Sequence, residues 1–491
     1  MLSPTVLLSA LVGYFALLLL VSRLVGRGSQ QGNGAFFRAN GRSPWPLVAF
    51  GMIGASISGV SFISVPGYVG LTQMTYLQMC MGFFLGYLLV AFVLLPVFYS
   101  RRLTSIYGYL EERFGPSAHR TGASFFLLSK LARACASFYL ASAVLQQFIF
   151  APLGIPYAIG MLLLLLLVWL YTQRSGLLAL VYTDTLQTLC MLGALVGLLW
   201  MIGSSMHLSL SGMVHTIAQS DLSRVFVFDD WSCRQSFWKQ FLSGIFIVIV
   251  MTGLDQDMMQ KNLTCRTLRH AQKDMCSYGF CFIPVNLLFL SLGVLLYQFC
   301  HFQDLPIPAQ SDELLPTLVQ ANYFGPVVTL LFVLGVTAAA FSSVDSALTA
   351  LTTSFCIDIL WLERRFPQDD GHVRHIRRMV HFAVVMVFLL CTWLFRAFNS
   401  TSVIDAVYVM ASYTYGPLLG LFAYGLLCRK RPVDRLIPVI ALLAPVLCYV
   451  LSVCVPRWTG YHFGYELLML NGLLTCLGLH LTTLFRRRKA A

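Results

Sequence analysis

Apolar stretches of about twenty residues recur along the whole chain and constrain its fold more than any other feature. A helix of that length crosses the hydrocarbon core of a bilayer, which is about 30 Å thick. Only 11% of the 491 residues are charged, too few to cover a soluble globule of this size. We therefore predict an all-α polytopic membrane protein with about thirteen transmembrane helices. The expected spans are residues 4–22, 46–70, 76–99, 119–150, 156–172, 178–203, 237–260, 275–299, 325–360, 377–398, 402–427, 436–455 and 465–485.

Lys and Arg residues fall in short clusters between the apolar stretches, mainly in alternate loops. This distribution marks the cytoplasmic side of a membrane protein and argues against a nucleic-acid partner, despite the net charge of +13. Arg23 and Arg27 follow the first apolar run, whereas the positive charges of a secretory signal precede it. We therefore expect a retained first helix, an outside N-terminus, a cytoplasmic C-terminus and a plasma-membrane location.

Cysteine and histidine residues form no recognisable catalytic or metal-binding set. The 14 cysteines lie mostly in apolar segments and predict free buried thiols, with a bridge between Cys233 and Cys300 as the alternative. The histidines are scattered, mostly in loops. We therefore expect a protein that is not an enzyme, and nothing in the chain indicates an obligate protein partner.

The span 46–70 carries an unusual number of small polar residues. Gly51, Gly54 and Gly59 are accompanied by four serines, and glycine in a helix interior costs about 1 kcal/mol relative to alanine. One interpretation is a broken helix whose freed backbone carbonyls line a cavity or bind an ion. The other is a packing face that lets two helices approach closely.

The span 325–360 carries a polar stripe. Ser342, Asp345, Ser346 and Thr349 follow helical spacing on one face, and Ser343 lies beside them. Hydroxyl and carboxylate oxygens together suit a small hard cation. The alternative is hydrogen bonding between helices by serine and threonine.

Two further spans place charges at membrane depth. Asp184 needs either a bound cation or a distant Lys or Arg partner. Arg133 shares a helix face with Lys130 and lies about 20 Å along the helix from Arg120, too deep to reach the interface easily. Arg133 either pairs with a protein acid or presents its guanidinium to an anionic substrate.

Four segments resemble the sodium/solute symporter family, which includes sodium-coupled sugar, proline and sialic acid transporters. They are the Phe-Phe-Arg to Trp run at 36–45, the Gly-Leu-Leu-Ala-Leu-Val-Tyr-Thr-Asp-Thr-Leu-Gln run at 176–187, the Thr-Gly-Leu-Asp-Gln-Asp-Met-Met-Gln-Lys run at 252–261 and residues 338–358. The resemblance implies five helices repeated with inverted topology, as in the leucine-transporter fold. It divides the chain into a leading helix and loop (1–45), a ten-helix core (46–430) and two trailing helices with a basic tail (431–491).

The resemblance also implies site residues. A first sodium site would use backbone carbonyls and hydroxyls of Gly54, Ile57, Ala339, Ser342 and Ser343. A second sodium site, known in some members, would use Asp184, Ser342, Asp345 and Ser346, although Asp345 replaces a neutral hydroxyl of several members. Substrate contacts would come from Ser56, Ser58, Val60, Ser61, Tyr76 and Cys80.

The function implied is sodium-coupled import of a small polar solute by alternating access. The sugar-transporting members carry a Glu-Gln pair where this chain has Val60 and Ser61, which disfavours the same sugar chemistry. The sialic acid members use an Arg on core helix three, and Arg133 falls at a comparable place. We therefore expect a carboxylate such as sialic acid, with sodium as the co-transported ion. The alternatives are a neutral sugar or polyol, proton coupling, or a transporter-like sensor.

Overall fold

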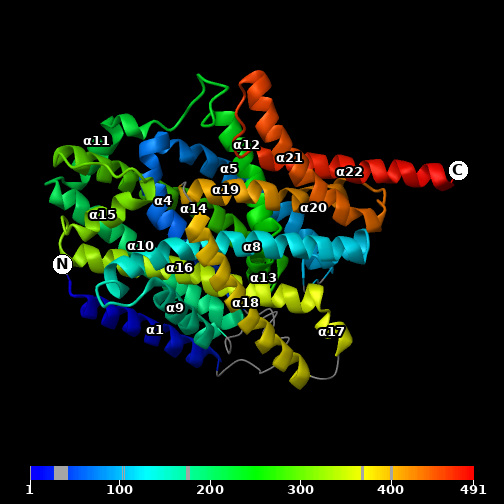
Figure 1. The fold of residues 1–491 in the computed structure, drawn as a ribbon, viewed down its shortest axis with the longest axis horizontal. Helices are drawn as coiled ribbons and strands as arrows, with labels where there is room; N and C mark the ends of the chain where they lie inside the picture. Colours follow the sequence, from blue (N-terminus) through cyan, green and yellow to red (C-terminus); the bar gives the residue numbers. More distant parts are fainter. Residues whose placement is uncertain are drawn as a thin grey trace.

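The computed structural model describes residues 2–26, 43–101, 103, 105–172, 177–366, 370–398 and 402–490, and these residues are almost entirely helical (Figure 1). The first half contains α1 (Pro4–Gly26), α3 (Trp45–Ser56), α4 (Gly59–Thr72), α5 (Tyr76–Leu89), α6 (Leu95–Arg101), α7 (Gly108–Arg113), α8 (Pro116–Leu145), α9 (Tyr157–Thr172), α10 (Leu177–Ser205) and α11 (Leu210–Gln219). The second half contains α12 (Phe237–Val248), α13 (Gln256–Asn262), α14 (Leu268–Phe302), α15 (Leu314–Gln320), α16 (Pro326–Ser354), α17 (Leu362–Arg365), α18 (Asp370–Phe398), α19 (Val403–Thr414), α20 (Gly416–Leu427), α21 (Ile437–Thr459) and α22 (Leu467–Ala490).

The predicted all-α class is confirmed, because every expected span coincides with one helix or with two consecutive helices, whereas the count of about thirteen transmembrane helices stays a prediction. By length and hydropathy, 8 helices of the described residues are long enough to cross a membrane, or 10 if each of two bent pairs is one span. The remaining expected spans correspond to shorter apolar helices such as α3, α9 and α22. All 14 cysteines are free thiols, as predicted.

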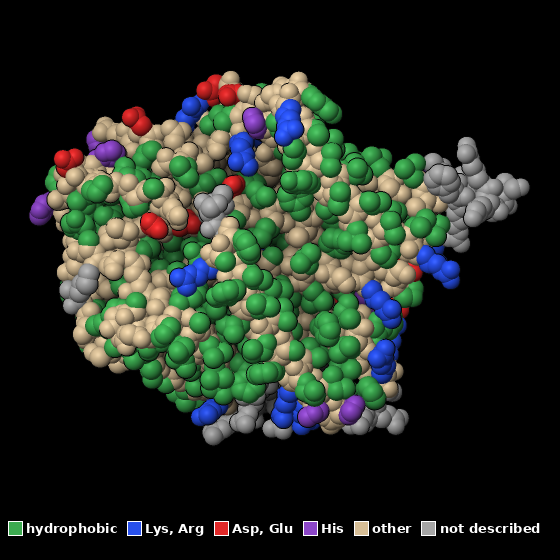
Figure 2. Space-filling view, in the orientation of Figure 1, with side chains coloured by type: hydrophobic (Ala, Val, Ile, Leu, Met, Phe, Trp, Pro, Cys, Tyr) green, Lys and Arg blue, Asp and Glu red, His purple; other side chains and the backbone are tan. Residues whose placement is uncertain are grey.

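The exterior is apolar over much of its area. Large hydrophobic side chains are exposed along α9, α18 and α21, where a soluble protein would carry charges. On the face drawn in Figure 2, hydrophobic side chains cover most of the middle, and charged side chains lie mainly near the margins. Figure 1 places the two ends of the chain at opposite ends of the molecule. This surface is suited to lipid contact.

Two helices are broken at the starts of the two five-helix halves. The first break separates α3 from α4 at Ile57 and Ser58, whose backbones are extended, and the Ser58 side chain accepts a hydrogen bond from Val60 N. The second separates α12 from α13, with a bend of 70°. Asp255 caps α13 by accepting hydrogen bonds from the backbone amides of Asp257 and Met258. The span 46–70 is therefore a broken helix, as the first interpretation of its sequence expected, and its glycines also allow close helix packing, as the second expected.

The first break lies in the centre of the bundle. α3 packs against α10, α14 and α16, and α16 also packs against α8 and α10. Gly54 is needed for this approach, because a Cβ at this position would overlap Thr188 Oγ1 of α10. The close packing brings the last turn of α3 against the polar stripe of α16.

Candidate ion and solute site

The end of α3 supplies backbone oxygens to the middle of α16. The last four carbonyls of a helix have no amide partner within it, so the break frees acceptors in the turn from Gly54 to Ile57. Ser343 Oγ lies 3.4 Å from the Ala55 carbonyl oxygen and 3.3 Å from that of Ala339. The structure therefore brings together the two chain segments that were expected to form the first sodium site.

Ser342 faces a different neighbour from Ser343. Its hydroxyl donates a hydrogen bond of 2.8 Å to Asp184 Oδ1 of α10. Ser342, Asp345 and Ser346 are almost completely buried, as is Asp184. The polar stripe of α16 thus has one side toward the break and one side toward the carboxylate of α10.

Lys261 of α13 is the partner of Asp184. Its Nζ lies 2.7 Å from Asp184 Oδ2 and 2.6 Å from Ser346 Oγ. Asp257 Oδ1 lies 3.7 Å from the same nitrogen. Of the two partners that the sequence allowed for Asp184, a distant basic residue is the one in contact. The sequence predicted that Lys261 would lie with Arg266 and Arg269 in a basic cytoplasmic loop, whereas the structure buries it in α13, beside α10.

The charged network continues from Lys261 to Arg133. Lys130 Nζ lies 2.6 Å from Asp257 Oδ2 and 3.3 Å from each Asp255 oxygen. Arg133 Nη2 lies 3.1 Å from Asp255 Oδ2. Tyr415 donates a 3.1 Å hydrogen bond to the same oxygen. Arg133 therefore pairs with a protein acid, one of its two expected roles.

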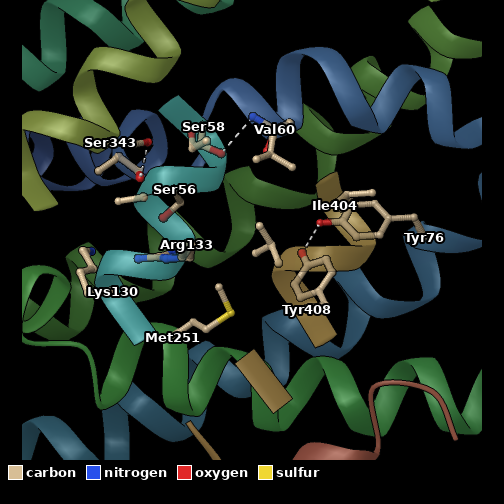
Figure 3. A pocket seen from close by; sticks show the side chains of 15 residues that line it. Ser56, Ser58, Val60, Tyr76, Lys130, Arg133, Met251, Ser343, Ile404 and Tyr408 are labelled. Atoms are coloured by element: carbon tan, nitrogen blue, oxygen red, sulfur yellow. Dashed lines mark hydrogen bonds between the residues drawn. The ribbon is translucent and has the colours of Figure 1, made fainter. Parts of the chain in front are cut away.

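Arg133 also lines a pocket beside the first break. Its side chain remains 23% exposed, whereas that of Asp255 is completely buried. Figure 3 shows Lys130 and Arg133 beside each other, with Tyr76 and Tyr408 on the opposite side of the pocket. Of the expected substrate residues, Ser56, Ser58, Val60, Ser61 and Tyr76 line this pocket together with Arg133.

Cys80 does not line this pocket and is completely buried one helical turn beyond Tyr76. Its contact with a solute stays a prediction. Residues that sequence reasoning did not single out complete the wall, namely Ala55, Ala134, Ser137, Met251, Ile404, Val407 and Tyr408. The pocket therefore combines hydroxyls, two cations and an apolar side.

Tyrosines fix the polar wall of the pocket to neighbouring helices. Tyr76 and Tyr408 share a 2.8 Å hydrogen bond between α5 and α19. The Ser56 hydroxyl contacts Tyr278 of α14, which in turn accepts a 2.7 Å hydrogen bond from Tyr87. These contacts link the end of α3 to α14, and they link α5 to both α14 and α19.

Two of the four family motifs, at 36–45 and 176–187, are only partly covered by the structure. Residues 36–42 and Gly176 fall outside the described residues. The motifs at 252–261 and 338–358 contribute Lys261 and the polar stripe of α16, respectively. Asp184 comes from the remaining motif.

Comparisons with known proteins point to one family. The sequence model that represents the sodium:solute symporter family matches residues 36–432. A sodium-dependent multivitamin transporter of Oryctolagus cuniculus is 29% identical over 448 residues, covering 86% of this chain and 68% of that protein. A sodium/sialic acid symporter of Proteus mirabilis is 24% identical over 449 residues, covering 89% of this chain and 88% of that protein.

A solved structure shares the fold. The outward-open state of a sodium-coupled sialic acid symporter superposes with a TM-score of 0.81 at 20% identity, over 98% of both chains. These relatives are multi-pass membrane transporters of small molecules, and the family is not a family of enzymes. With the match over most of its length, this chain belongs to the sodium:solute symporter family, and sodium is its co-transported ion.

Proposed function

We propose that the chain imports a small hydroxylated carboxylate, of which sialic acid is the first candidate, together with sodium across the plasma membrane. The observation that carries the proposal is the arrangement of Ser343 between the broken end of α3 and the Ala339 carbonyl, beside a pocket that contains Arg133. The N-terminus outside and the C-terminus in the cytoplasm accord with ends that lie on opposite sides of the molecule. Residues 46–430 would form the transporting core.

The sodium site would consist of neutral oxygens. The carbonyls of Gly54, Ile57 and Ala339 and the hydroxyls of Ser342 and Ser343 are hard oxygen ligands of the kind that small cations prefer. A sodium ion among them would join α3 to α16 across the break. Because a bound ion would hold α3 and α16 together, sodium would stabilise one of the two states of alternating access relative to the other.

The solute site would be the pocket beside the ion. A guanidinium presents a planar fork of donors that matches a carboxylate, and the serines and tyrosines can exchange hydrogen bonds with hydroxyl groups. Arg133 keeps part of its surface in the pocket although Asp255 holds one nitrogen. The names of bacterial relatives as sialic acid symporters support this class of solute. A neutral sugar or polyol is the alternative.

A sodium experiment tests the ion site. Purified wild-type protein in proteoliposomes should accumulate the best solute of a labelled panel only when a sodium gradient is imposed at fixed pH. Ser343→Ala removes one ligand to a charged ion, worth about 1.5–3 kcal/mol, so the sodium concentration for half-maximal uptake should rise by about tenfold to a hundredfold.

Thr329→Ala is the matched control for that experiment. Thr329 is a buried hydroxyl on the same helix, where it lies 3.5 Å from the Gly325 carbonyl oxygen of its own first turn. Its removal should leave sodium dependence unchanged. Unaltered sodium dependence in Ser343→Ala would contradict the proposed ion site, and uptake driven by a proton gradient without sodium would favour proton coupling.

A second experiment tests the solute class. Arg133→Lys retains a positive charge for Asp255 but loses the planar fork, so affinity for a carboxylate solute should fall while sodium affinity stays near wild type. Arg133→Ala should lose carboxylate uptake altogether. Equal affinity of the wild type and Arg133→Lys for the best solute would remove the carboxylate clamp and favour a neutral sugar or polyol.

A further inference from the structure

Two neighbouring glutamates of the short helix α7 contact different parts of the bundle. Glu112 pairs with Arg101 at the end of α6. Glu111 instead lies 2.9 Å from Nδ1 of His119 in α8 and 2.8 Å from each of two nitrogens of Arg364 in α17. One side chain therefore ties α7 to α6, and the next ties it to α8 and α17.

The helices on the two sides of α7 pack into different groups. α6 ends the apolar segment that begins with α4 and α5, and α5 packs against α12 and α14. α8 packs mainly against α16, α18 and α19. Alternating access moves one group of helices relative to another. The contacts of α7 therefore bear on how readily the two groups separate at this end of the bundle.

His119 lies between two carboxylates from different elements. Its Nδ1 faces Glu111, and its Nε2 lies 2.8 Å from Asp358 Oδ1 in the helical turn that follows α16. A neutral imidazole has one N–H, so its other nitrogen would turn a lone pair toward a carboxylate oxygen. A doubly protonated ring donates to both carboxylates. We call the contacts of His119 with Glu111 and Asp358 the histidine latch.

The two carboxylates of the histidine latch depend differently on its proton. Glu111 keeps its two hydrogen bonds from Arg364 whatever the charge of His119. The Asp358 side chain is completely buried, and its second oxygen accepts a hydrogen bond of 2.5 Å from the Ser354 hydroxyl. Loss of the His119 proton would leave Asp358 without a charged donor among the described residues. A buried carboxylate in that state is costly, so the contact between α8 and the end of α16 would weaken.

Other charged groups surround the histidine latch. Arg120 and Arg364 lie over the ring of Trp361, whose centroid is 5.3 Å from that of the His119 ring. Trp361 has a φ of +58°, a left-handed conformation that a bulky residue keeps only where its surroundings enforce it. Asp434 accepts hydrogen bonds from two backbone amides in the first turn of α8. Of these residue types, histidine is the one that ordinarily changes charge between about pH 5 and pH 8.

We propose that His119 makes the opening of the cytoplasmic side sensitive to pH. With both ring protons it holds α7 against α8 and the end of α16, and without one of them it lets α7 move away. This inference rests on the transport function and the membrane orientation proposed above. Release of the solute into the cytoplasm requires this side to open once in each cycle, so import would slow as the cytoplasm becomes acidic.

Uptake measured at different pH values tests the histidine latch. Full-length protein in proteoliposomes would take up labelled N-acetylneuraminic acid at saturating concentration under a fixed sodium gradient. The pH would be equal on both sides and set between about 5.5 and about 8, so that no proton gradient forms and the carboxylate stays ionised. The initial rate of the wild type should rise by roughly threefold to tenfold over this range, because one charge-assisted hydrogen bond is weakened without being removed.

Three variants separate the charge of His119 from its packing. His119→Arg keeps a permanent charge with several donors, so its rate should stay low at every pH. His119→Gln is neutral, so its rate should stay high at every pH. His375→Gln is the matched control, because His375 is an exposed histidine near the start of α18. It should keep the pH dependence of the wild type.

The fluorescence of Trp361 gives a second measurement that needs no transport. Its emission, taken as the difference between the wild type and Trp361→Phe, should change over the same pH range, because the charge of the neighbouring His119 ring changes. The same difference measured in the His119→Arg background should not change with pH.

The outcomes distinguish the histidine latch from the function on which it rests. A wild-type rate that stays level or falls as the pH rises would overturn the latch, and so would a rise that persists in His119→Arg. Both results hold even if His119→Gln fails to fold. If the wild type shows no sodium-driven uptake of N-acetylneuraminic acid, the proposed solute fails, and the emission of Trp361 decides about the latch. An emission that is constant with pH, or that changes equally in the His119→Arg background, would overturn it.

Discussion

The two broken helices begin equivalent halves of the fold, yet their breaks are chemically opposite. The break between α3 and α4 is made of glycine, serine and isoleucine and places neutral carbonyls near Ser343. The break between α12 and α13 begins with Asp255 and is held by Lys130 and Arg133. The same architectural element is neutral in one half and densely charged in the other.

The difference indicates a division of labour. Neutral oxygens can release a sodium ion without leaving an uncompensated buried charge, so the first break can exchange an ion during each cycle. Separating the buried ion pairs of the second break would leave charges exposed to a low-dielectric medium, which costs several kcal/mol per ion. The first break is therefore suited to bind and release an ion, and the second is suited to hold α13 in place.

The largest expected effect comes from removing a charge at the second break. Asp255→Asn leaves Lys130 and Arg133 with one acid fewer and weakens the cap of α13. Breaking a buried pair by removing one partner typically destabilises by about 3–5 kcal/mol. We expect a large fall in the thermal unfolding midpoint of detergent-purified protein, measured by tryptophan fluorescence and size-exclusion chromatography.

Asp229→Asn supplies the control for that measurement. Asp229 also pairs with an arginine, Arg224, but its side chain is 67% exposed in a loop. The change should move stability by less than about 1 kcal/mol. Equal effects of the two substitutions would break the contrast between the two helix breaks, because the charges around Asp255 would then contribute no more than surface charges.

A smaller effect is expected from adding a methyl group at each break. Gly54→Ala drives a Cβ into Thr188 Oγ1, a short branched side chain that is completely buried. A Cβ at Gly253, next to the second break, would lie 2.5 Å from Leu94 Cδ1 and 2.7 Å from Val90 Cγ2, a smaller overlap than the 1.9 Å between a Cβ at Gly54 and Thr188 Oγ1. Overpacking costs about 1–3 kcal/mol where the neighbour cannot move. We expect Gly54→Ala to be the more destabilising of the two in the same unfolding assay.

A double substitution sharpens this test. Thr188→Ala removes the atom that the new methyl group overlaps, so Gly54→Ala combined with Thr188→Ala should recover part of the stability. Sodium affinity should follow the same order, because the Gly54 carbonyl belongs to the proposed ion site. A Gly54→Ala protein as stable as Gly253→Ala would show that α3 does not depend on close approach to α10.

Much of this arrangement was predictable from local sequence. Apolar runs of bilayer length give the helices, because a backbone in lipid must satisfy its hydrogen bonds within each segment. The glycines and serines before Pro66 indicated where a helix would fail, and the break falls at Ile57 and Ser58 within that run. Helical spacing also predicted that Ser342 and Ser346 share a face, and both contact the Asp184–Lys261 pair.

Contacts between side chains on helices that are distant in sequence could not be predicted from the sequence. Asp184 and Lys261 are 77 residues apart, and periodicity says nothing about which helices become neighbours. The sequence showed that Asp184 needed a counter-charge without choosing between an ion and a lysine. Tyr408 was missed for the same reason, since it reaches the pocket from α19 by bonding to Tyr76. Cys80 was assigned by its position in the family, and in the structure it is completely buried and does not line the pocket.

The smallest effect is expected at an ion pair away from both breaks. This exposed pair serves as a reference for the buried ion pairs of the second break. Glu111 of α7 receives both nitrogens of Arg364 at 2.8 Å, and His119 lies 2.9 Å away. Burial acts to raise the pKa of Glu111, but the hydrogen bonds from Arg364 and His119 outweigh it and lower that pKa below its ordinary value of 4.5. Because Arg364 is 61% exposed, Glu111→Gln should cost no more than about 1 kcal/mol at pH 7.

The pH dependence follows from the lowered pKa of Glu111. The ionised carboxylate contributes its full stability above pH 4.5, and that contribution is lost as the pH falls through the lowered pKa of the folded protein. The wild type and Glu111→Gln should therefore differ in unfolding midpoint at pH 7 and converge once the pH falls below the lowered pKa of Glu111. Added choline chloride, which carries no sodium, should shrink the difference by screening. The contrast between buried and exposed ion pairs would fail if the midpoint difference for Glu111→Gln persisted in acid and in salt and was as large as that for Asp255→Asn.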